Sequence, residues 1–416
     1  MREMKDSGTP WCDKIPSNWQ ALRLKYVMNN YDSQRMPVDA GKRSQEGDIL
    51  YDYYGASGVI DSIDGYTHTG RRILIGEDGA NLVLRNLPLI YIADGKYWVN
   101  NHAHILAPKY GWSLDYFAHQ MEVIDYFEYI TGAAQPKLSQ GNLSKVCLVV
   151  PPVEEQYRIA DFLNKKCTEI DALSADIQSE IDTLEAYKRS VITEAVTKGL
   201  DKNVAMKDSG TPWCPRIPSH WQYTNPKALF TQRFDRAYAG ERQLTASQEY
   251  GIVYQDEFME MTGNRVVTVM KDFSILKHVE PGDFVISMRS FQGGLEYSEV
   301  KGCISSAYVM LVPNNKLVYP PFYRWFFKSD KYINAIQSTS NLVRDGQAMR
   351  YANFVQVPLF IIPLNEQKKI AEYLNTHISE IDEIKRQKQE QLAILADYKK
   401  SIIYEYVTGK KEVPSA

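Results

Sequence analysis

Two segments of the chain repeat apolar residues with the period of an α-helix, one at about 154–198 and one at about 365–408. In each segment one apolar stripe recurs every seven residues and a second stripe accompanies it, which predicts a helix that packs along its whole length. Each predicted helix has about 45 residues and is roughly 65–70 Å long at ~1.5 Å per residue. The stripes are Leu163, Ile170, Ile177, Leu184 and Val191 with Ile159, Leu173 and Tyr187, then Leu374, Ile381, Lys388, Leu395 and Ile402 with Ile370, Ile384 and Tyr398.

The ends of both helices carry the expected signals. Pro151-Pro152 and two glutamates precede or open the first helix, Asn365 is a candidate cap for the second, and Gly199 and Gly409 follow their last turns. An apolar stripe of this length has to be covered. We expect the two helices to cover each other as an antiparallel coiled coil with a pseudo-two-fold axis. The alternative is that each helix packs only on its own domain.

The remaining chain alternates short apolar runs with Gly, Asp and Asn, which predicts strands joined by tight turns. In the first such stretch, about 20–150, a helical pattern follows at 113–130. In the second, strand-like segments at 266–276, 283–288 and 303–312 precede a helical pattern at 320–337. We therefore predict an α+β protein: two mixed α/β domains with curved sheets, joined by the two long helices.

An internal repeat organises these elements. Residues 5–20 (KDSGTPWCDKIPSNWQ) and 207–222 (KDSGTPWCPRIPSHWQ) are identical at thirteen of sixteen positions, 202 residues apart. A second match, 151–164 with 362–375, lies 211 residues apart, so the second insert is 9 residues longer. The chain is a tandem duplication with constant ends and divergent middles, as expected when a scaffold is fixed and a binding specificity varies. It divides into domains 1–152 and 201–362 and helices 153–200 and 363–416.

Composition narrows the functional classes only partly. The net charge of −3 counts against a simple electrostatic DNA binder but leaves room for local basic patches or a partner that supplies charge. Tyrosine is abundant, with 28 Tyr against 14 Phe, which suits either a partly polar binding surface or a β-rich core. The five cysteines form no C-x-x-C pair, and the chain has neither a signal-peptide pattern at its start nor 18 consecutive apolar residues. We expect a cytoplasmic protein with reduced thiols and no membrane contact.

The sequence lacks the usual signatures of catalysis. It contains no G-x-x-x-x-G-K-[ST] phosphate loop and no Asn-Pro-Pro-aromatic motif of the adenine methyltransferase kind. His102 and His104 alternate along a predicted strand without a third candidate metal ligand. We therefore expect a protein without a catalytic or metal site of its own.

Several motifs resemble one known family over nearly the whole chain. YYGASGVID (53–61), LIGEDGANL (74–82), YWVNNHAHIL (97–106) and AAQPKLS (133–139) resemble a target-recognition domain of type I restriction-modification specificity subunits. GDFVISMRSFQGGLEYS (282–298) and CISSAYVMLVP (303–313) resemble another member's recognition domain. The openings of both helices, with their shared Glu-Gln, resemble the spacer helices of that family.

The resemblance implies a non-catalytic DNA-reading subunit. Its two recognition domains would each read one half of a split, asymmetric site in double-stranded DNA, and its helices would set the spacing between the halves. The helices would also dock two methyltransferase (M) subunits, and two restriction (R) subunits would join the larger assembly. The subunit itself would need no cofactor, neither S-adenosylmethionine nor ATP. The alternative function is a coiled-coil adaptor that never binds DNA.

Base recognition requires fixed donors and acceptors, with Arg suited to guanine and Asn or Gln to adenine. By the repeat, the turn 76–81 corresponds to 287–292, and residues 100–102 correspond to 305–308. Arg71 and Arg72 are candidate phosphate contacts or parts of a solvated turn, and the acidic Glu77 and Asp78 suit phosphates poorly but can accept from cytosine. The other candidates are Tyr53, Tyr54, Ser57, Asn81, Asn101, His102, Gln135 and Lys137 in the first domain, and Arg289, Ser290, Gln292, Arg344, Gln347 and Arg350 in the second.

Overall fold

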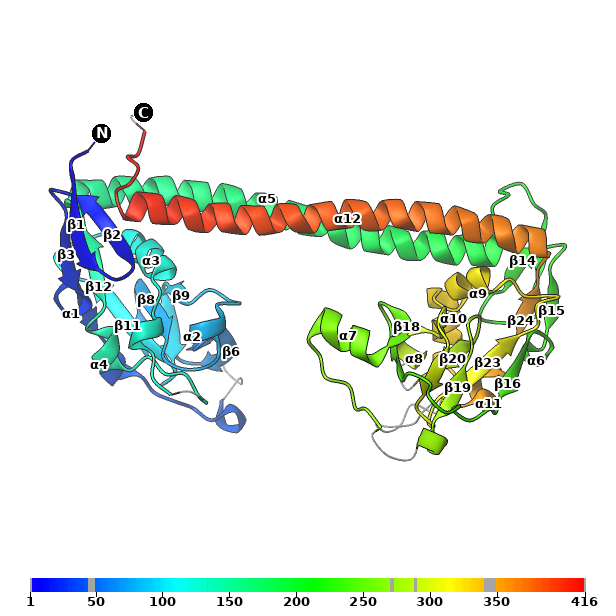
Figure 1. Ribbon diagram of the computed structural model, residues 1–416. Helices are drawn as coiled ribbons and strands as arrows, with labels where there is room; N and C mark the ends of the chain where they lie inside the picture. Colours follow the sequence, from blue (N-terminus) through cyan, green and yellow to red (C-terminus); the bar gives the residue numbers. More distant parts are fainter. Residues whose placement is uncertain are drawn as a thin grey trace. The chain divides into compact units, whose positions relative to one another are not determined.

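The computed structural model describes residues 2–43, 49–132, 134–269, 273–287, 290–339 and 349–414. The chain forms two compact units, and each long helix is shared between them (Figure 1). Unit 1 comprises residues 1–178 with 390–416, and unit 2 comprises residues 179–389. Each unit therefore contains one α/β domain, the first half of the helix that follows it and the second half of the other helix.

The long helices are α5 (Val153–Lys198) and α12 (Leu364–Val407). In unit 1, Lys399 Nζ lies 2.6 Å from Asp171 Oδ1, and in unit 2, Lys188 Nζ lies 2.6 Å from Asp382 Oδ1. The residue numbers of both pairs add to 570, so the early part of one helix pairs with the late part of the other. This constant sum is the register of an antiparallel pair within each unit, as predicted from the sequence.

Only one of the two predicted apolar stripes lies in the seam between the helices. Residues of the first stripe are largely buried, whereas Leu173, Tyr187, Ile384 and Tyr398 of the second are 49%, 55%, 44% and 52% exposed. The prediction was wrong for these four residues. The second stripe lies three positions after the first. The residues that fill the rest of the seam lie four positions after the first stripe, which is one residue, or about 100°, further around the helix. Examples are Cys167, Ile181 and Ile378.

The domain of unit 1 contains a four-stranded sheet in the order β4-β11-β8-β9, a second four-stranded sheet in the order β6-β5-β10-β7, and two small antiparallel pairs, β1-β2 and β3-β12. Strands β5 and β10 pair in parallel, and the other neighbouring strands of these two sheets are antiparallel. The strands are β1 Met4–Thr9, β2 Cys12–Pro16, β3 Gln20–Arg23, β4 Met28–Asn30, β5 Leu50–Gly55, β6 Gly58–Asp64, β7 His68–Thr69, β8 Arg72–Gly76, β9 Ile90–Ala93, β10 Lys96–Val99, β11 Ala103–Pro108 and β12 Cys147–Val150. The helices are α1 Leu24–Val27, α2 Asn81–Leu84, α3 Leu114–Val123 and α4 Gln140–Leu143.

The domain of unit 2 repeats this strand order. Its four-stranded sheet runs β16-β23-β20-β21, and the pairs β13-β14, β15-β24, β17-β18 and β19-β22 correspond to pairs in unit 1. The strands are β13 Met206–Asp208, β14 Arg216–Pro218, β15 Gln222–Thr224, β16 Phe230–Arg233, β17 Leu244–Ser247, β18 Gly251–Tyr254, β19 Lys277–Val279, β20 Phe284–Ile286, β21 Glu296–Tyr297, β22 Gly302–Ile304, β23 Val309–Pro313 and β24 Leu359–Ile361. The helices are α6 Pro226–Leu229, α7 Gln255–Thr262, α8 Ser290–Gly293, α9 Pro320–Phe326, α10 Asp330–Gln337 and α11 Tyr351–Phe354.

Three local predictions need correction. Among the described residues, 266–276 holds no strand: a short 3₁₀ turn occupies Phe273–Ile275, and β19 begins only at Lys277. The helical pattern at 113–130 ends after Val123, and the pattern at 320–337 is broken into α9 and α10. In the last case the interruption is at Ser329, whose backbone is extended. Its hydroxyl donates to the Phe326 carbonyl, a bond that competes with continuation of the helix.

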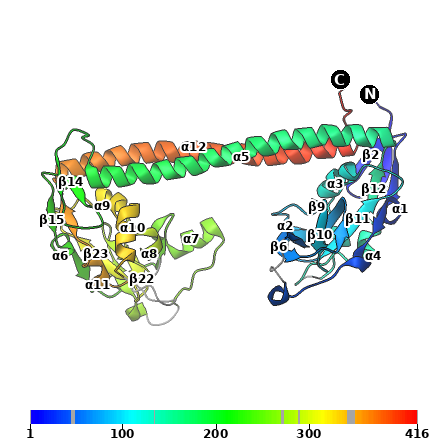
Figure 2. The same ribbon diagram turned by 180° about the vertical axis from the view of Figure 1, so that it is seen from behind.

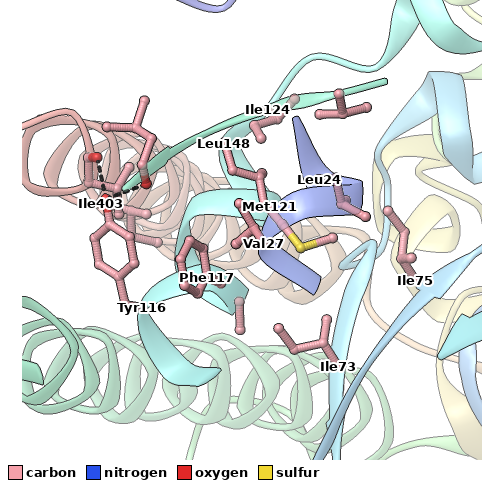
Figure 3. Packing of buried hydrophobic residues seen from close by; sticks show 14 of the residues in the cluster. Leu24, Val27, Ile73, Ile75, Tyr116, Phe117, Met121, Ile124, Leu148 and Ile403 are labelled. Carbon is pink, nitrogen blue, oxygen red and sulfur yellow. Dashed lines mark hydrogen bonds between the residues drawn. The ribbon is translucent and has the colours of Figure 1, made fainter. Parts of the chain in front are cut away.

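The core of unit 1 joins the domain to the end of α12. Figures 1 and 2 both show α3 between the β4-β11-β8-β9 sheet and the long helices. Figure 3 shows Phe117 and Met121 of α3 among side chains of the sheet and of β12, with Tyr116 close to Ile403. The buried Tyr116 hydroxyl lies 2.9 Å from the Val407 carbonyl at the end of α12. The last turns of α12 are therefore part of the core of a domain that begins almost four hundred residues earlier in the chain.

The constant segments of the repeat meet at a joint in each unit. In unit 1 the buried indole of Trp19 donates through Nε1 to Glu155 Oε2 at 2.9 Å, near the start of α5. In unit 2 Trp221 donates equally to Glu366 Oε2 at 3.1 Å, near the start of α12. Gly409, just after α12, lies against Trp19 with φ of +71°.

The glutamine that follows each of these glutamates adds to the joint. Gln156 accepts from the Ser113 amide at 3.0 Å, and Gln367 accepts from the Tyr319 amide at 2.7 Å. Both residues also donate to the carbonyl five residues before them, at Pro151 and Ile362. The repeated Glu-Gln pair therefore fixes a domain to the helix that follows it. We name this arrangement of tryptophan, glutamate and glutamine the helix joint.

We predict that Glu155→Ala lowers the free energy of unfolding of unit 1 by about 2 kcal/mol, because the buried Trp19 N–H loses its charged acceptor. Glu366→Ala should do the same to unit 2. The measurement is hydrogen exchange of the full chain in urea, read separately for segments of each unit. Glu169→Ala, on the exposed surface of α5, serves as the control and should change little. Equal losses in both units from either variant would contradict a local joint.

Candidate nucleic-acid interface

Three loops of unit 1 meet beyond the ends of β8 and β11. The Glu77 amide donates to the His102 carbonyl at 2.8 Å, which joins the loop after β8 to the turn before β11. The Leu138 amide donates to the Glu77 carbonyl at 2.7 Å, and the Gly79 amide donates to the Pro136 carbonyl at 3.0 Å. Segment 134–138 is thereby paired along the first loop. Residues from three distant positions of the sequence come together in this way.

The polar side chains around these loops are exposed. Lys137 Nζ lies 3.2 Å from Glu77 Oε1, and His102 Nδ1 lies 2.8 Å from Asp78 Oδ2. The tip of the β5–β6 hairpin, which carries Ser57, approaches the same loops. A Cβ at Gly76 would lie only 2.7 Å from the Ala56 carbonyl oxygen, so this contact requires glycine. We call the exposed residues Ser57, Asn101, His102, Gln135 and Lys137 the rim of unit 1.

A buried charge network lies beneath the rim. Arg35 donates to Glu77 and to the carbonyls of Asn101 and Ala103, and His104 contacts Asp32 at 2.6 Å. Burial alone would raise the pKa of Asp32, but the hydrogen bond and the charge of His104 lower it below its ordinary value. The pKa of Glu77 is lowered in the same way, against its burial, by the hydrogen bond from Arg35 and the charge of His104.

Several predicted site residues of unit 1 are engaged inside the domain instead. Tyr53 and Tyr54 are buried, and the Tyr53 hydroxyl accepts from the Val38 amide at 3.0 Å. The Asn81 side chain ties together its own loop by accepting from the Leu87 amide at 2.9 Å. Arg71 pairs with Asp115 at 2.7 Å, and the Arg72 guanidinium lies 4.8 Å from the centre of the Tyr31 ring.

In unit 2 the corresponding hairpin also lies against a glycine. A Cβ at Gly293 would lie 2.5 Å from Gln248 Nε2, at the tip of the β17–β18 hairpin. Of the predicted residues, Gln292 and Arg350 are exposed, whereas Ser290 is buried and its hydroxyl accepts from the Ser287 amide at 2.8 Å. The other three predictions, Arg289, Arg344 and Gln347, lie outside the described residues.

Sequence reasoning missed the residues that support the rim. Asp32 and Arg35 precede the Glu77 loop by more than forty residues, and no local pattern connects them. The sequence singled out His104 only as a possible metal ligand, because of its spacing from His102. The structure separates the two histidines: His102 is exposed in the turn before β11, and His104 is fully buried within that strand at 0% exposure. Strand alternation places residues two apart on the same face, so the spacing of the two histidines gave no signal of this difference.

Two negative findings apply to the described part of the chain. No three His, Cys, Asp or Glu side chains there lie close enough together to hold a metal ion. None of the helices there is long and apolar enough to cross a membrane. The rim offers hydrogen-bond donors and acceptors on a buried electrostatic support, an arrangement suited to recognising a polar surface.

The fold defines a class of protein: a duplicated chain with corresponding strands in its two domains, different exposed polar residues in each, and two paired long helices. Residues 16–183 and 244–393 match the family described as type I restriction modification DNA specificity domains. These two regions make up more than half of the chain, and the protein belongs to this family. Membership confirms the prediction of a specificity subunit rather than a catalytic one.

Individual relatives agree with the family. The chain is 25% identical over 378 residues to a putative type I restriction enzyme specificity subunit of Methanocaldococcus jannaschii, covering 88% of this chain and 79% of the relative. It is 32% identical over 141 residues to a putative type I restriction enzyme specificity subunit of Haemophilus influenzae, a match that spans only 35% of that relative. A solved structure from work on assembly and conformational transition of the type I R-M system has a TM-score of 0.66 at 13% identity, with 95% of this chain and 99% of that chain covered, which shows the shared fold.

We predict that Arg35→Ala lowers the free energy of unfolding of unit 1 by about 3 kcal/mol at pH 7, because the buried carboxylates of Glu77 and Asp32 lose the guanidinium that they share. Since the pKa values of Asp32 and Glu77 are lowered in the folded state, the stability they add is complete above their ordinary values of 3.8 and 4.5 and is lost as the pH falls through the folded values. The deficit of the variant should therefore shrink in acid. Hydrogen exchange of unit 1 at several pH values measures it.

Arg71→Ala is the matched control for this prediction. Its guanidinium is half exposed and pairs with Asp115 at the surface, so its loss should change the free energy of unfolding by less than about 1 kcal/mol. If Arg35→Ala were no more destabilising than Arg71→Ala at pH 7, the buried network would not support the rim.

Proposed function

We propose that this chain is the DNA sequence-specificity subunit of a type I restriction-modification complex and that each unit reads one half of a bipartite, asymmetric site in double-stranded DNA. The observation that carries the proposal is the combination of one strand order with two different sets of exposed polar residues. A common scaffold with different rims suits two half-sites of different sequence. The paired helices would set the spacing between the half-sites.

The rim of unit 1 has the chemistry for base recognition. Asn101 and Gln135 carry amides, which can donate and accept on an adenine edge, and Lys137 can donate to guanine. Asp78 accepts from His102 in the free protein and has the acceptor chemistry that cytosine N4 requires. In unit 2 we propose Gln292 and Arg350 from the described residues. Arg289, Arg344 and Gln347 remain candidates there on the sequence alone.

The proposal assigns different roles to the engaged residues. Tyr53, Tyr54, Asn81 and Ser290 have partners or positions inside their domains, so we propose that they shape the loops without contacting bases. Arg71 and Arg72 remain candidate phosphate contacts, with Arg71 exchanging Asp115 for a phosphate on binding. Such a contact would position the DNA without reading its sequence.

We predict that Asn101→Ala reduces discrimination at one half-site and Gln292→Ala reduces it at the other, each by about 1–3 kcal/mol if the amide contacts a base. The measurement is the affinity of the chain, with its methyltransferase partner, for duplexes in which either half-site is scrambled. Asn18→Ala removes an exposed asparagine of the constant segment and should change neither. The adaptor alternative predicts no sequence-dependent binding, and loss at the same half-site from both variants would contradict the proposed division.

The exposed second stripe of the helices suggests where partners dock. Leu173 and Tyr398 lie at nearly the same level of the helix pair in unit 1, because their numbers add to 571. Tyr187 and Ile384 do so in unit 2. The two pairs are equivalent by the repeat, since Leu173 and Ile384 are 211 residues apart, as are Tyr187 and Tyr398. Large apolar side chains half exposed at duplicated positions suit two copies of one partner.

We propose that these two apolar pairs bind two methyltransferase subunits, one in each unit, and that restriction subunits join the resulting complex. The proposal rests on the family and on the duplication of the pairs. No catalytic group of this chain takes part: methyl transfer and cleavage belong to the partners. The low net charge of the chain is compatible with this arrangement, since a partner can supply contacts to the DNA phosphates.

We predict that Tyr398→Glu removes one methyltransferase subunit from the purified complex and that Tyr187→Glu removes the other, each weakening that contact at least about tenfold because it buries a charge. Light-scattering mass of the assembled complex measures the stoichiometry. Ala393→Glu places the same charge about 140° around α12 from Tyr398 and is the matched control. An unchanged mass with both tyrosine variants, or an equal loss with the control, would contradict the proposed contacts.

A further inference from the structure

Among the residues that the structure describes, the ring of His104 contacts two hydrogen-bond acceptors and no donor. It lies on β11 and is fully buried at 0% exposure. Its Nδ1 lies 2.6 Å from Asp32 Oδ2, and its Nε2 lies 2.7 Å from the backbone carbonyl oxygen of Leu138. An ionised carboxylate and a carbonyl can only accept, so both ring nitrogens must carry a proton. A neutral imidazole has only one N–H, and the geometry is therefore that of the imidazolium cation.

The surroundings favour a positive ring. Asp32 also accepts from the Ile105 amide at 2.9 Å, and Glu77 Oε2 lies 3.9 Å from His104 Nδ1. The cations nearby are paired with the same carboxylates: Lys137 with Glu77, and Arg35 with Glu77 and, at 3.8 Å, with Asp32 Oδ2. Burial opposes the charged form of Asp32, yet its pKa is lowered, first by the hydrogen bond from His104 and then by the charge of His104.

We infer that His104 is held as a buried imidazolium that positions segment 134–138, and with it Gln135 and Lys137, for DNA reading by unit 1. The inference deepens the proposed function and rests on it. The contact with the segment is made at Leu138. The Leu138 amide donates to the Glu77 carbonyl, and the Leu138 carbonyl accepts from His104, so both backbone groups at the end of the segment are held. His104 acts through the segment and is a positioning residue.

Loss of the proton has a defined consequence. A neutral ring can satisfy Asp32 or Leu138 but not both, so one of the two contacts becomes a contact between two acceptors. Segment 134–138 then loses its support, and the affinity of unit 1 for its half-site should fall. Unit 2 has the apolar Val309 at the equivalent position, since Val309 pairs with Ile286 as His104 pairs with Ile75. The buried His278 of unit 2 lies elsewhere, on β19, with Glu241 and Glu280 as its partners. Substitution of His104 should therefore leave binding of the second half-site unchanged.

Asp32→Asn separates the charge from the contact. An asparagine at this position can accept from the Ile105 amide through its oxygen and donate to His104 Nδ1 through its nitrogen. A neutral ring that carries its proton on Nε2 then satisfies both Asn and the Leu138 carbonyl. The variant should therefore keep segment 134–138 in place while removing the need for the second proton. His104→Gln, whose single amide group reaches only one of the two partners, should lose the support at every pH.

The first measurement is nuclear magnetic resonance of the ring nitrogens in the full chain labelled with ¹⁵N-histidine, with His104→Gln to assign the signals. We expect both ring nitrogens of His104 to be protonated at pH 7, and only Nε2 to be protonated in Asp32→Asn. A neutral ring at pH 7 in the unaltered chain would overturn the inference without reference to DNA. The exposed His102, whose Nδ1 lies 2.8 Å from Asp78 Oδ2, provides a second histidine signal in the same sample.

The second measurement is DNA binding, with duplexes that retain either the first or the second half-site. His104→Gln should lower the affinity for the first half-site about tenfold, the effect of losing one charge-assisted hydrogen bond, and leave the second unchanged. Asp32→Asn, which keeps both contacts of the ring, should change neither. An unchanged affinity of His104→Gln for the first half-site, or a loss by Asp32→Asn as large as that by His104→Gln, would overturn the positioning role. A chain that binds neither half-site would overturn that role together with the proposed function, whereas ring protonation would still be decided by the first measurement.

Discussion

The hydrogen bond from a buried tryptophan to a glutamate near the start of a long helix is the contact on which each unit depends. Trp19 is fully buried, so its N–H has no access to water, and Glu155 is its acceptor. Because the same tryptophan lies against Gly409, the joint holds the beginning of one helix and the end of the other. The two segments that recur in both copies lie far apart in sequence, and in each unit they form the two halves of one joint.

A fixed joint leaves the remainder of each domain free to diverge as long as the strand order is kept. Gly76 illustrates the limit, since the backbone of the hairpin tip lies too close for any side chain there, whereas Gly293 in unit 2 faces the side chain of Gln248. Around them the sequences differ freely. Unit 1 supports its rim with buried ionic contacts among Arg35, Glu77 and His104, whereas an apolar Val309 replaces the histidine in unit 2. The two domains thus present different surfaces from the same scaffold.

The sequence predicted what depends on local periodicity and on the repeat. The seven-residue period of apolar residues predicted the two long helices. The internal repeat and the alternation of apolar runs with turn residues predicted their antiparallel pairing and the mixed domains. Burial of individual side chains did not follow. Tyr53 and Ser290 looked like binding residues because they sit in polar turns, but tertiary packing buries both. Leu173 was predicted to lie between the helices, but it is exposed. The residues three and four positions after the first stripe are both possible contacts, and the partner helix decides which of them is buried. Long-range register, which a single sequence does not contain, decides each of these cases.

The pairing of charges near the candidate interface bears on how much of the proposed DNA affinity would come from phosphate contacts. Three cations of the described residues already have acidic partners: Arg71 with Asp115, Lys137 with Glu77, and, in unit 2, Arg233 with Asp283. A cation that must leave a carboxylate to reach a phosphate gains less than a free one, so phosphate contacts from these residues would contribute little net affinity. Under the proposed function, base contacts would contribute discrimination instead. A subunit built in this way would select among sequences but depend on its partners for strength, which would make binding to DNA conditional on assembly of the complex.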